Sequence, residues 1–253
     1  MIKAVILGFG NTARHLYAAF SGSPEVEIVQ IYNRSERTIP FEIQVEFTSH
    51  LSEIENADVY IIAIPDDGIK DFSEKLPFHN RLVVHTSGSV EMQILSEKNR
   101  KGVFYPLQSF SKDRNINFTS VPICIEASNA SDLKTLHKLA RCISEKVMET
   151  SSEHRRKLHL AAVFINNFTN HLYHISEEIV TENNLDFDLL KPLIMETANK
   201  VNFFSPSEAQ TGPAKRNDKK TIEKHLDLLN NDQYKEIYKI ITKSIQQAHG
   251  KKL

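Results

Sequence analysis

The sequence predicts an α/β protein in which helices cover both faces of a doubly wound, mostly parallel sheet, followed by a smaller all-α domain. Two observations carry this prediction. Short apolar runs of strand length alternate with helical stretches through the first half of the 253 residues, and only helical spacing follows in the second half. Such alternation is typical of right-handed βαβ units, which build an open α/β sheet.

The first predicted strand leads directly into a glycine-rich turn. Residues 2–7 are apolar except for Lys3, and they run into Gly8-Phe9-Gly10-Asn11-Thr12-Ala13 at the start of a predicted helix over residues 11–21. In this G-x-G-x-x-A pattern the first glycine permits a tight turn, and the second lets the backbone approach a pyrophosphate. The small third residue lets the helix pack closely on the strand.

This turn is the pattern of a Rossmann-like dinucleotide-binding fold. The N–H groups at the start of a helix favour an anion, so the phosphates would bind there. We therefore expect the turn to bind a dinucleotide through Gly8, Gly10, Asn11, Thr12 and Ala13. The alternative is a tight turn that binds nothing.

Further strands and helices follow in order. The apolar run over residues 57–64 is nearly continuous, as expected for a parallel strand that is buried on both faces. Other strands are predicted at residues 26–32, 43–47, 81–85, 102–104 and 121–126. Helices are predicted at residues 131–145, 152–183, 186–201, 219–229 and 232–249.

The change of pattern predicts two domains. Residues 1–128 are expected to form the Rossmann domain, and residues 129–253 a helical domain for the substrate cleft and dimerisation. Ser131, with Asp132 behind it, is the expected N-cap of the first helix after the boundary.

Composition excludes several classes of protein. A net charge of -1 disfavours nucleic acid or an anionic membrane as the main partner. No apolar run approaches the roughly 18 to 20 residues that span a bilayer, and the N-terminus does not resemble a signal peptide. The two cysteines, Cys124 and Cys142, each lie inside an apolar pattern and are expected to be buried thiols of a cytoplasmic protein, the alternative being a redox pair.

The residues after the second strand indicate which cofactor would bind. A carboxylate there would bind a ribose 2′-hydroxyl and select NAD, but this chain has Asn33, Arg34 and Ser35 at that place. A guanidinium can bind a 2′-phosphate with two hydrogen bonds, so NADP is favoured. The alternative is an exposed turn with a solvated arginine.

Two more strand ends offer candidate residues at the same edge of the sheet. Ala63 and Pro65 follow the central strand and are expected beside the cofactor, although Asp66 after them could simply cap a helix. Thr86 and Ser87 follow the next strand and could line the nicotinamide or substrate side, or cap the helix behind them.

The helical half has two polar residues in an otherwise apolar stretch. His159 and Asn167 fall on or near one face of a predicted helix that is otherwise apolar there, so they are either satisfied core groups or the wall of a site. His171, His174 and Glu177 have helical spacing, but with no second cluster of ligands we predict no metal site.

Taken together, the motifs resemble a known group of proteins. They are Gly8 to Ala13, Asn33 to Ser35, Ala63 to Asp66, His85 to Gly88, Tyr105 to Phe110, His159 to Asn167, and Thr211 to Asp218. In this order they resemble the NADP oxidoreductases that join a Rossmann domain to a helical C-terminal domain of unknown function. That group is similar to pyrroline-5-carboxylate reductase, the β-hydroxyacid dehydrogenases and the deazaflavin-dependent NADP reductases.

The resemblance implies a cytoplasmic, dimeric protein with NADP in its N-terminal domain and a small-molecule substrate between the domains. Hydride would pass between NADP(H) and a carbonyl, imine or alcohol. His159 would donate or accept the proton, and Asn167 or Ser87 would orient the substrate.

The sequence departs from the group at one position. The β-hydroxyacid dehydrogenases have a catalytic lysine one helical turn before an asparagine, whereas Ala162 and Val163 stand one turn before Asn166 and Asn167 here. A non-catalytic NADP-binding sensor or interaction protein is therefore the alternative function. A third possibility is a structural dimer that binds no nucleotide.

Overall fold

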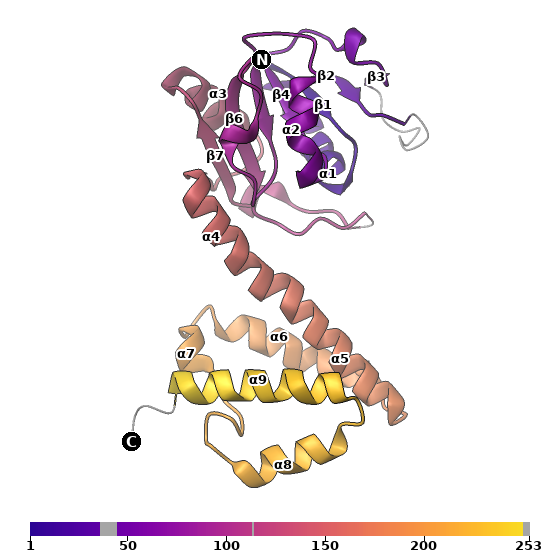
Figure 1. Cartoon of the computed structure of the whole chain (residues 1–253), viewed down its shortest axis with the longest axis vertical. Coiled ribbons are helices and arrows are strands. Elements are labelled where there is room, and N and C mark those ends of the chain that lie inside the picture. The colour runs from indigo at the N-terminus through magenta and orange to yellow at the C-terminus, as the bar shows by residue number, and fades with distance from the viewer. Residues whose placement is uncertain (36–44, 113, 250–253) are drawn as a thin grey trace. The chain divides into compact units, whose positions relative to one another are not determined.

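The computed structural model describes residues 1–35, 45–112 and 114–249, which divide into two compact units, Met1–Asn166 and Asn167–Leu253 (Figure 1). The first unit contains an eight-stranded sheet with helices on both faces. The described residues of the second unit form only helices and their connections. This confirms the predicted α/β fold class. The compact units divide between Asn166 and Asn167, and the domain boundary near residue 128 stays a prediction.

The strands of the sheet lie in the order β3-β2-β1-β4-β5-β6-β7-β8. All neighbours are parallel except β6 and β7, which are antiparallel. The strand bounds are β1 Ile2–Leu7, β2 Val26–Tyr32, β3 Glu46–Thr48, β4 Val59–Ile62, β5 Leu82–His85, β6 Arg100–Pro106, β7 Ile123–Ala127 and β8 Val147–Glu149. β1 pairs with β2 on one side and with β4 on the other. The order of the strands therefore reverses at β1, which is the topological switch point of the sheet.

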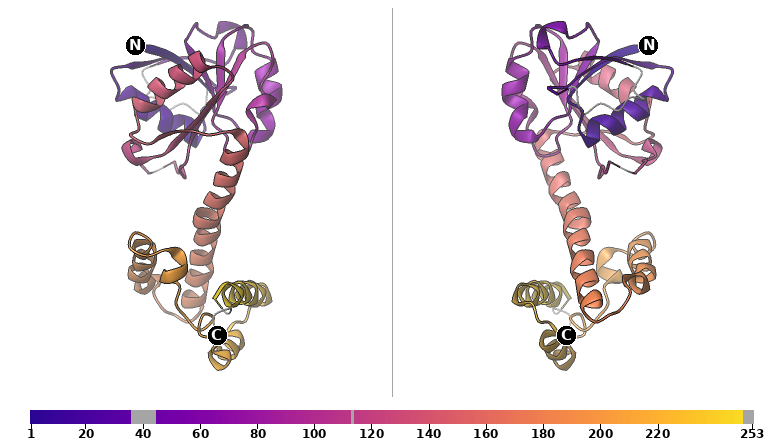
Figure 2. Two further views of the ribbon diagram at one scale, coloured as in Figure 1. Left: turned by 90° about the vertical axis from the view of Figure 1, so that its left-hand side faces the viewer. Right: turned by 90° about the vertical axis from the view of Figure 1, so that its right-hand side faces the viewer.

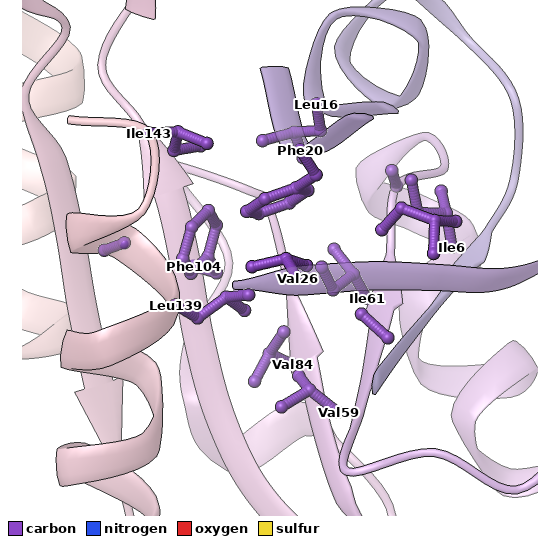
Figure 3. Packing of buried hydrophobic residues seen from close by; sticks show 14 of the residues in the cluster. Ile6, Leu16, Phe20, Val26, Val59, Ile61, Val84, Phe104, Leu139 and Ile143 are labelled. Atoms are coloured by element: carbon purple, nitrogen blue, oxygen red, sulfur yellow. The ribbon is translucent and has the colours of Figure 1, made fainter. Parts of the chain in front are cut away.

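Alternation along the strands divides the core into two layers. Ala4 and Ile6 face α1 (Asn11–Ser21) and α3 (Ala130–Arg141), whereas Val5 and Leu7 face the side of α2 (Ile69–Glu74). Both views of Figure 2 show α2 on the opposite side of the sheet from α1 and α3. In Figure 3, Phe104 of β6 lies between Phe20 of α1 and Leu139 of α3.

The remaining helices follow β8. In the first unit α4 (Ser152–Ala162) runs into a π-helical stretch, Val163–Phe168, at whose residues the two units divide. The second unit contains α5 Thr169–Glu182, a 3-10 turn at Phe187–Leu190, α6 Lys191–Lys200, α7 Pro206–Ala209, α8 Lys219–Leu228 and α9 Asp232–His249. In the part of the chain that the structure describes, no helix has the length and apolar character to cross a membrane.

Three details differ from the sequence-based expectations. A short strand, β8, joins the sheet after residue 128, where only helices were expected. Asn129, not Ser131, caps α3, because its side chain accepts the N–H of Asp132. The strand expected at residues 43–47 appears as β3, and its first two expected residues lie outside the described part of the chain.

The turn after β1 requires glycine at its first position. Gly8 has φ = 101°, a left-handed value that side chains rarely adopt. A Cβ atom there would lie 2.5 Å from Ile64 Cγ2 and 2.7 Å from the Ala63 carbonyl oxygen. The close packing of β1 against the end of β4 therefore depends on the absence of a side chain.

We expect Gly8→Ala to lower the free energy of unfolding by at least about 2 kcal/mol, because backbone strain and overpacking add. Gly22→Ala is the matched control, since Gly22 has φ = -83° and its Cβ atom would make only an ordinary contact of 3.6 Å. Urea unfolding followed by circular dichroism measures both. An equal effect of the two substitutions would contradict this explanation.

Candidate functional site

Four predicted cofactor-binding residues begin loops along one edge of the sheet. In each case the N–H of the first residue after a strand donates to the last carbonyl of the neighbouring strand. The bonds run from Asn33 to Thr48 (3.1 Å), Gly8 to Tyr32 (2.7 Å), Ala63 to Leu7 (2.8 Å) and Thr86 to Ile62 (3.1 Å). We call this set the edge row. It brings the four loops together at the carboxyl edge, where open α/β sheets bind ligands.

The glycine turn leaves space and open N–H groups at the start of α1. A Cβ atom built on Gly10 would meet no described atom within 4 Å, so the fold itself does not require glycine there. Among the described residues, no side chain caps α1 and none in its first turn is acidic. This arrangement fits a pyrophosphate, which needs both the space over the second glycine and the free N–H groups of the helix.

The other turn residues hold the helix in place. Ala13 is fully buried against the sheet, as a small residue at the third motif position should be. Asn11 Nδ2 donates to the Phe110 carbonyl at 3.2 Å, which ties the start of α1 to the loop after β6. Thr12 is half-buried in the same turn of α1.

The turn after β2 places Arg34 at the surface. Asn33 Nδ2 donates to the Ser35 carbonyl at 2.9 Å and closes the turn around it. Both Arg34 and Ser35 are exposed beside the edge row. The predicted 2′-phosphate residues therefore lie next to the strand that adjoins the glycine turn, and their role stays a prediction.

The loops after β4 and β5 are joined by side chains. Pro65 begins the single turn Asp66–Gly68, which leads into α2. The Ser89 hydroxyl donates to the Asp66 carboxylate, linking the two loops. The Asp66 side chain thus binds across to the next loop and does not cap its own turn.

Ser87 is occupied within its own loop. Its Oγ accepts the N–H groups of Ser89 at 3.1 Å and Val90 at 3.0 Å. The Ser87 N–H donates to Nδ1 of the buried His85 at 3.2 Å. These bonds give Ser87 a structural role in shaping the loop, and its predicted contact with substrate is untested.

Within the first unit, His159 of α4 contacts Tyr105 of β6 and Gly88 of the loop after β5. The Tyr105 hydroxyl lies 3.1 Å from His159 Nδ1, and the two rings meet edge to face at 6.0 Å. A methyl group on Gly88 would lie 2.6 Å from His159 Nδ1 and 2.7 Å from Tyr105 Cζ. The imidazole and the phenol therefore rest directly on the main chain of the loop after β5.

Burial controls the protonation of Tyr105. The loss of water around the ring raises the pKa of Tyr105 to about 12, and the neighbouring Cys124 adds to the effect. The hydroxyl therefore keeps its proton throughout the physiological range of pH.

Arg155 anchors the helix that carries His159. Its side chain is fully buried, and its guanidinium forms an ion pair with Glu126 of β7 and donates to the Val90 carbonyl. Ser152 Oγ joins the cluster, donating to Glu126 at 2.8 Å and accepting the Met92 N–H at 3.0 Å. Arg155 stands one helical turn before His159, so this cluster sets where the imidazole lies.

The role of Asn167 stays a prediction. Asn167 is the first residue of the second unit and its side chain is exposed. Residues 163–168, which include Asn167, are π-helical and not regularly α-helical. No three metal-ligating side chains cluster within the described residues, and His174 lies instead 3.4 Å from Glu178 at the surface.

Sequence reasoning missed two residues of this site. Tyr105 stood only in the motif Tyr105 to Phe110, and its pairing with His159 spans 54 positions. Arg155 lies in Ser152-Glu153-His154-Arg155-Arg156-Lys157, which has the composition of an exposed helix. The only signal for a buried Arg155 would have been Glu126, which the pairing of β7 with β6 and β8 places beneath α4.

His85 is a buried histidine below the same loop. Loss of water and the nearby Arg155 guanidinium lower its pKa from the usual 6.5 to about 4. Nδ1 accepts the Ser87 N–H, so the neutral ring carries its proton on Nε2. His85 therefore stays uncharged at neutral pH.

This shift makes stability depend on pH. Between pH 6.5 and 4 the unfolded chain binds a proton at His85 that the folded chain does not, so stability falls as the pH is lowered through this window. We expect this residue to contribute a loss of about 2 kcal/mol between pH 7.5 and 5. His85→Asn, which keeps an acceptor for Ser87, should remove that part of the pH dependence in urea unfolding. An unchanged pH dependence in the variant would contradict the assignment.

Comparisons with known proteins identify the family of this chain. The protein-family model described as "Domain of unknown function (DUF2520)" matches residues 121–245. A solved structure described as a "putative NADP oxidoreductase" from Bacteroides fragilis is 38% identical, with a TM-score of 0.89 over 97% of this chain and 98% of that one. No curated protein matches the sequence.

More distant structures share the fold alone. An imine reductase from Myxococcus stipitatus in complex with NADP+ is 13% identical, with a TM-score of 0.66 over 98% of this chain and 96% of that one. A 1-pyrroline-5-carboxylate reductase from Streptococcus pyogenes is also 13% identical, with a TM-score of 0.65 over 98% of each chain. The match to the Bacteroides fragilis protein is stronger evidence, because it combines 38% identity with nearly complete coverage of both chains. This chain belongs to the same family as that protein, with the DUF2520 domain over residues 121–245.

Proposed function

We propose that this protein is an NADP-dependent oxidoreductase that acts on a small carbonyl, imine or alcohol. The observation that carries the proposal is the glycine turn at the topological switch point, where Gly10 leaves space that the fold does not need. The family relation supports it, because the Bacteroides fragilis protein is described as an NADP oxidoreductase. NADPH would supply the hydride, and the protein would supply position and polarity.

The edge row and its neighbours would hold the cofactor. The pyrophosphate would bind at the start of α1, over Gly10 and against the N–H groups of the first turn. Arg34 would bind the 2′-phosphate, with Asn33 and Ser35 beside it. The other proposed cofactor-binding residues are Gly8, Asn11, Thr12, Ala13, Ala63, Pro65 and Thr86.

His159 would exchange the proton that accompanies hydride transfer. Reduction of a C=O or C=N bond adds hydride to carbon and a proton to oxygen or nitrogen, and an imidazole can give or take that proton near neutral pH. The ring is half-buried and held by Tyr105, which leaves it partly open to a substrate. Ser87 and Asn167 remain proposed substrate-orienting residues.

The proposal includes a cytoplasmic homodimer. The second unit exposes many large apolar side chains, more than a monomer in water usually presents. They include Leu189, Leu193, Met195 and Phe203, which are 71%, 63%, 60% and 81% exposed. The same unit contains an apolar cavity of about 390 Å³ between α5, α8 and α9, with Leu172 and Ile241 on its wall. A second copy of the chain is the partner we propose for the exposed side chains.

The cofactor site is tested by calorimetric titration with NADPH and with NADH. We expect tighter binding of NADPH, and a loss of roughly ten- to a hundredfold in NADPH affinity in Arg34→Ala, because a charged hydrogen bond to phosphate is removed. NADH affinity should not change. Arg81→Ala is the matched control, since Arg81 is exposed just before β5, at the opposite edge of the sheet.

Gly10→Val extends the same titration. Gly10 has extended backbone angles and open space in front of it, so valine should leave the fold intact while blocking the phosphate. A folded Gly10→Val protein that binds NADPH normally would refute the site. If the unaltered protein bound neither nucleotide, the oxidoreductase proposal would fail, and the first unit would be a scaffold that binds no nucleotide.

The catalytic role is tested by NADPH oxidation over a panel of carbonyl and imine substrates. We expect His159→Ala to lower kcat by about 10²- to 10⁴-fold with unchanged NADPH affinity, because the proton donor is lost. His154→Ala is the control, since His154 is an exposed histidine on the same helix. NADPH binding without turnover of any substrate would favour the non-catalytic sensor.

A further inference from the structure

We propose that Tyr105 is a positioning residue that holds Nδ1 of His159, so that Nε2 is the nitrogen that exchanges a proton with the substrate and carries the proton of the resting neutral ring. This inference rests on the proposed role of His159. It adds which ring nitrogen is used and which residue selects it.

The geometry allows two arrangements of a neutral pair, and the direction of one hydrogen bond distinguishes them. The Tyr105 hydroxyl and His159 Nδ1 are 3.1 Å apart, so one of them donates to the other. A neutral imidazole has one N–H and one acceptor nitrogen. When the hydroxyl donates, Nδ1 is the acceptor and the ring proton must sit on Nε2.

The surroundings favour the hydroxyl as donor. Tyr105 is 8% exposed, and the high pKa of its buried phenol keeps it protonated. Besides His159, the titratable and charged groups that act on the pKa of Tyr105 are Cys124, Arg155 and Asp66. Arg155 donates to Glu126 and the Val90 carbonyl, Asp66 accepts from Ser89, and burial raises the pKa of the Cys124 thiol, so none of them competes for Nδ1.

Gly88 closes the space around Nδ1. A methyl group at this position would lie 2.6 Å from Nδ1, which is too close for a carbon atom that is not bonded to it. The loop therefore packs so closely on this nitrogen that no side chain fits between them at position 88. The described residues form no hydrogen bond with Nε2, which leaves it for a substrate.

A tyrosine hydroxyl suits both directions of the reaction. When the imidazolium gives a proton to the substrate, the N–H bond at Nε2 breaks and an O–H or N–H bond forms on the substrate. The neutral ring keeps its proton on Nδ1, and the hydroxyl turns and accepts it, because an O–H group can both donate and accept. The imidazolium forms when the resting ring takes up a proton from solvent. Oxidation of the alcohol or amine reverses the transfer and starts from the neutral ring with its proton on Nδ1, where the hydroxyl accepts it and Nε2 is free to take the substrate proton.

Nitrogen NMR of the full chain labelled with ¹⁵N-histidine tests the tautomer directly. The chain has 11 histidines, and the His159 signals are identified by their loss in His159→Gln. In the unaltered protein, above the pH at which the ring loses its charge, we expect the Nε2–H tautomer alone. In Tyr105→Phe we expect a mixture of both tautomers. A proton on Nδ1 in the unaltered protein, or tautomer signals unchanged in Tyr105→Phe, would overturn the proposal.

Turnover gives a second readout. Tyr105→Phe should lower kcat roughly five- to tenfold, the value of one neutral hydrogen bond, and leave NADPH affinity unchanged. Tyr60→Phe is the matched control, because it removes another buried phenolic hydroxyl, which bonds to Ala57 at 2.9 Å and Glu55 at 3.0 Å. It should leave kcat and the His159 signals unchanged.

The two proposals fail separately. If Tyr105→Phe does not fold, the spectrum of the unaltered protein still decides the tautomer. If no substrate is turned over, the oxidoreductase function fails, while the same spectrum still tests the pairing of Tyr105 with His159.

Discussion

The edge row sets the geometry from which the rest of the site follows. Each of its bonds joins two main-chain groups, so the starting points of four loops are fixed by the register of the parallel strands and not by side chains. Leu7, Ile62 and His85 are paired in register across three strands, and the loops therefore leave the sheet from one line. Each bond is worth only about 1 kcal/mol net, but a lost bond would leave a main-chain N–H unpaired.

A second constraint fixes α4 relative to the sheet within the first unit. Removing one partner of a buried ion pair typically costs 3 to 5 kcal/mol, because the other charge remains buried without compensation. Arg155 and Glu126 form such a pair, with Ser152 and the Val90 carbonyl completing the cluster. The edge row therefore places the loop that contains Gly88, and the ion pair places His159 against it.

The sequence was sufficient for the features that depend on local pattern. The apolar run that became β4 and the glycine turn were predictable, because burial on both faces and a left-handed glycine leave clear signals. The strand β8 was not, because it has only three residues and two of them are exposed. Asn129 and Ser131 are both good caps by residue type, and only the extended backbone at Asn129 distinguishes them.

The candidate site was predictable only in part. The cofactor residues follow strand ends, and the edge row brings four of them together. The pairing of Tyr105 with His159 depends on how α4 crosses the sheet, which no local pattern encodes. Residues 163–168 form a π-helix, which no local pattern of the sequence predicted.

The position of Gly88 has a consequence for the entropy of the site. A side chain that supported His159 would have several rotamers, and the imidazole would share its mobility. Apart from the buried Tyr105 side chain, the support here is main chain, held between β5 and the two N–H groups that bind Ser87. The freedom of the imidazole is therefore lost during folding, and little of it remains to be lost when a substrate arrives.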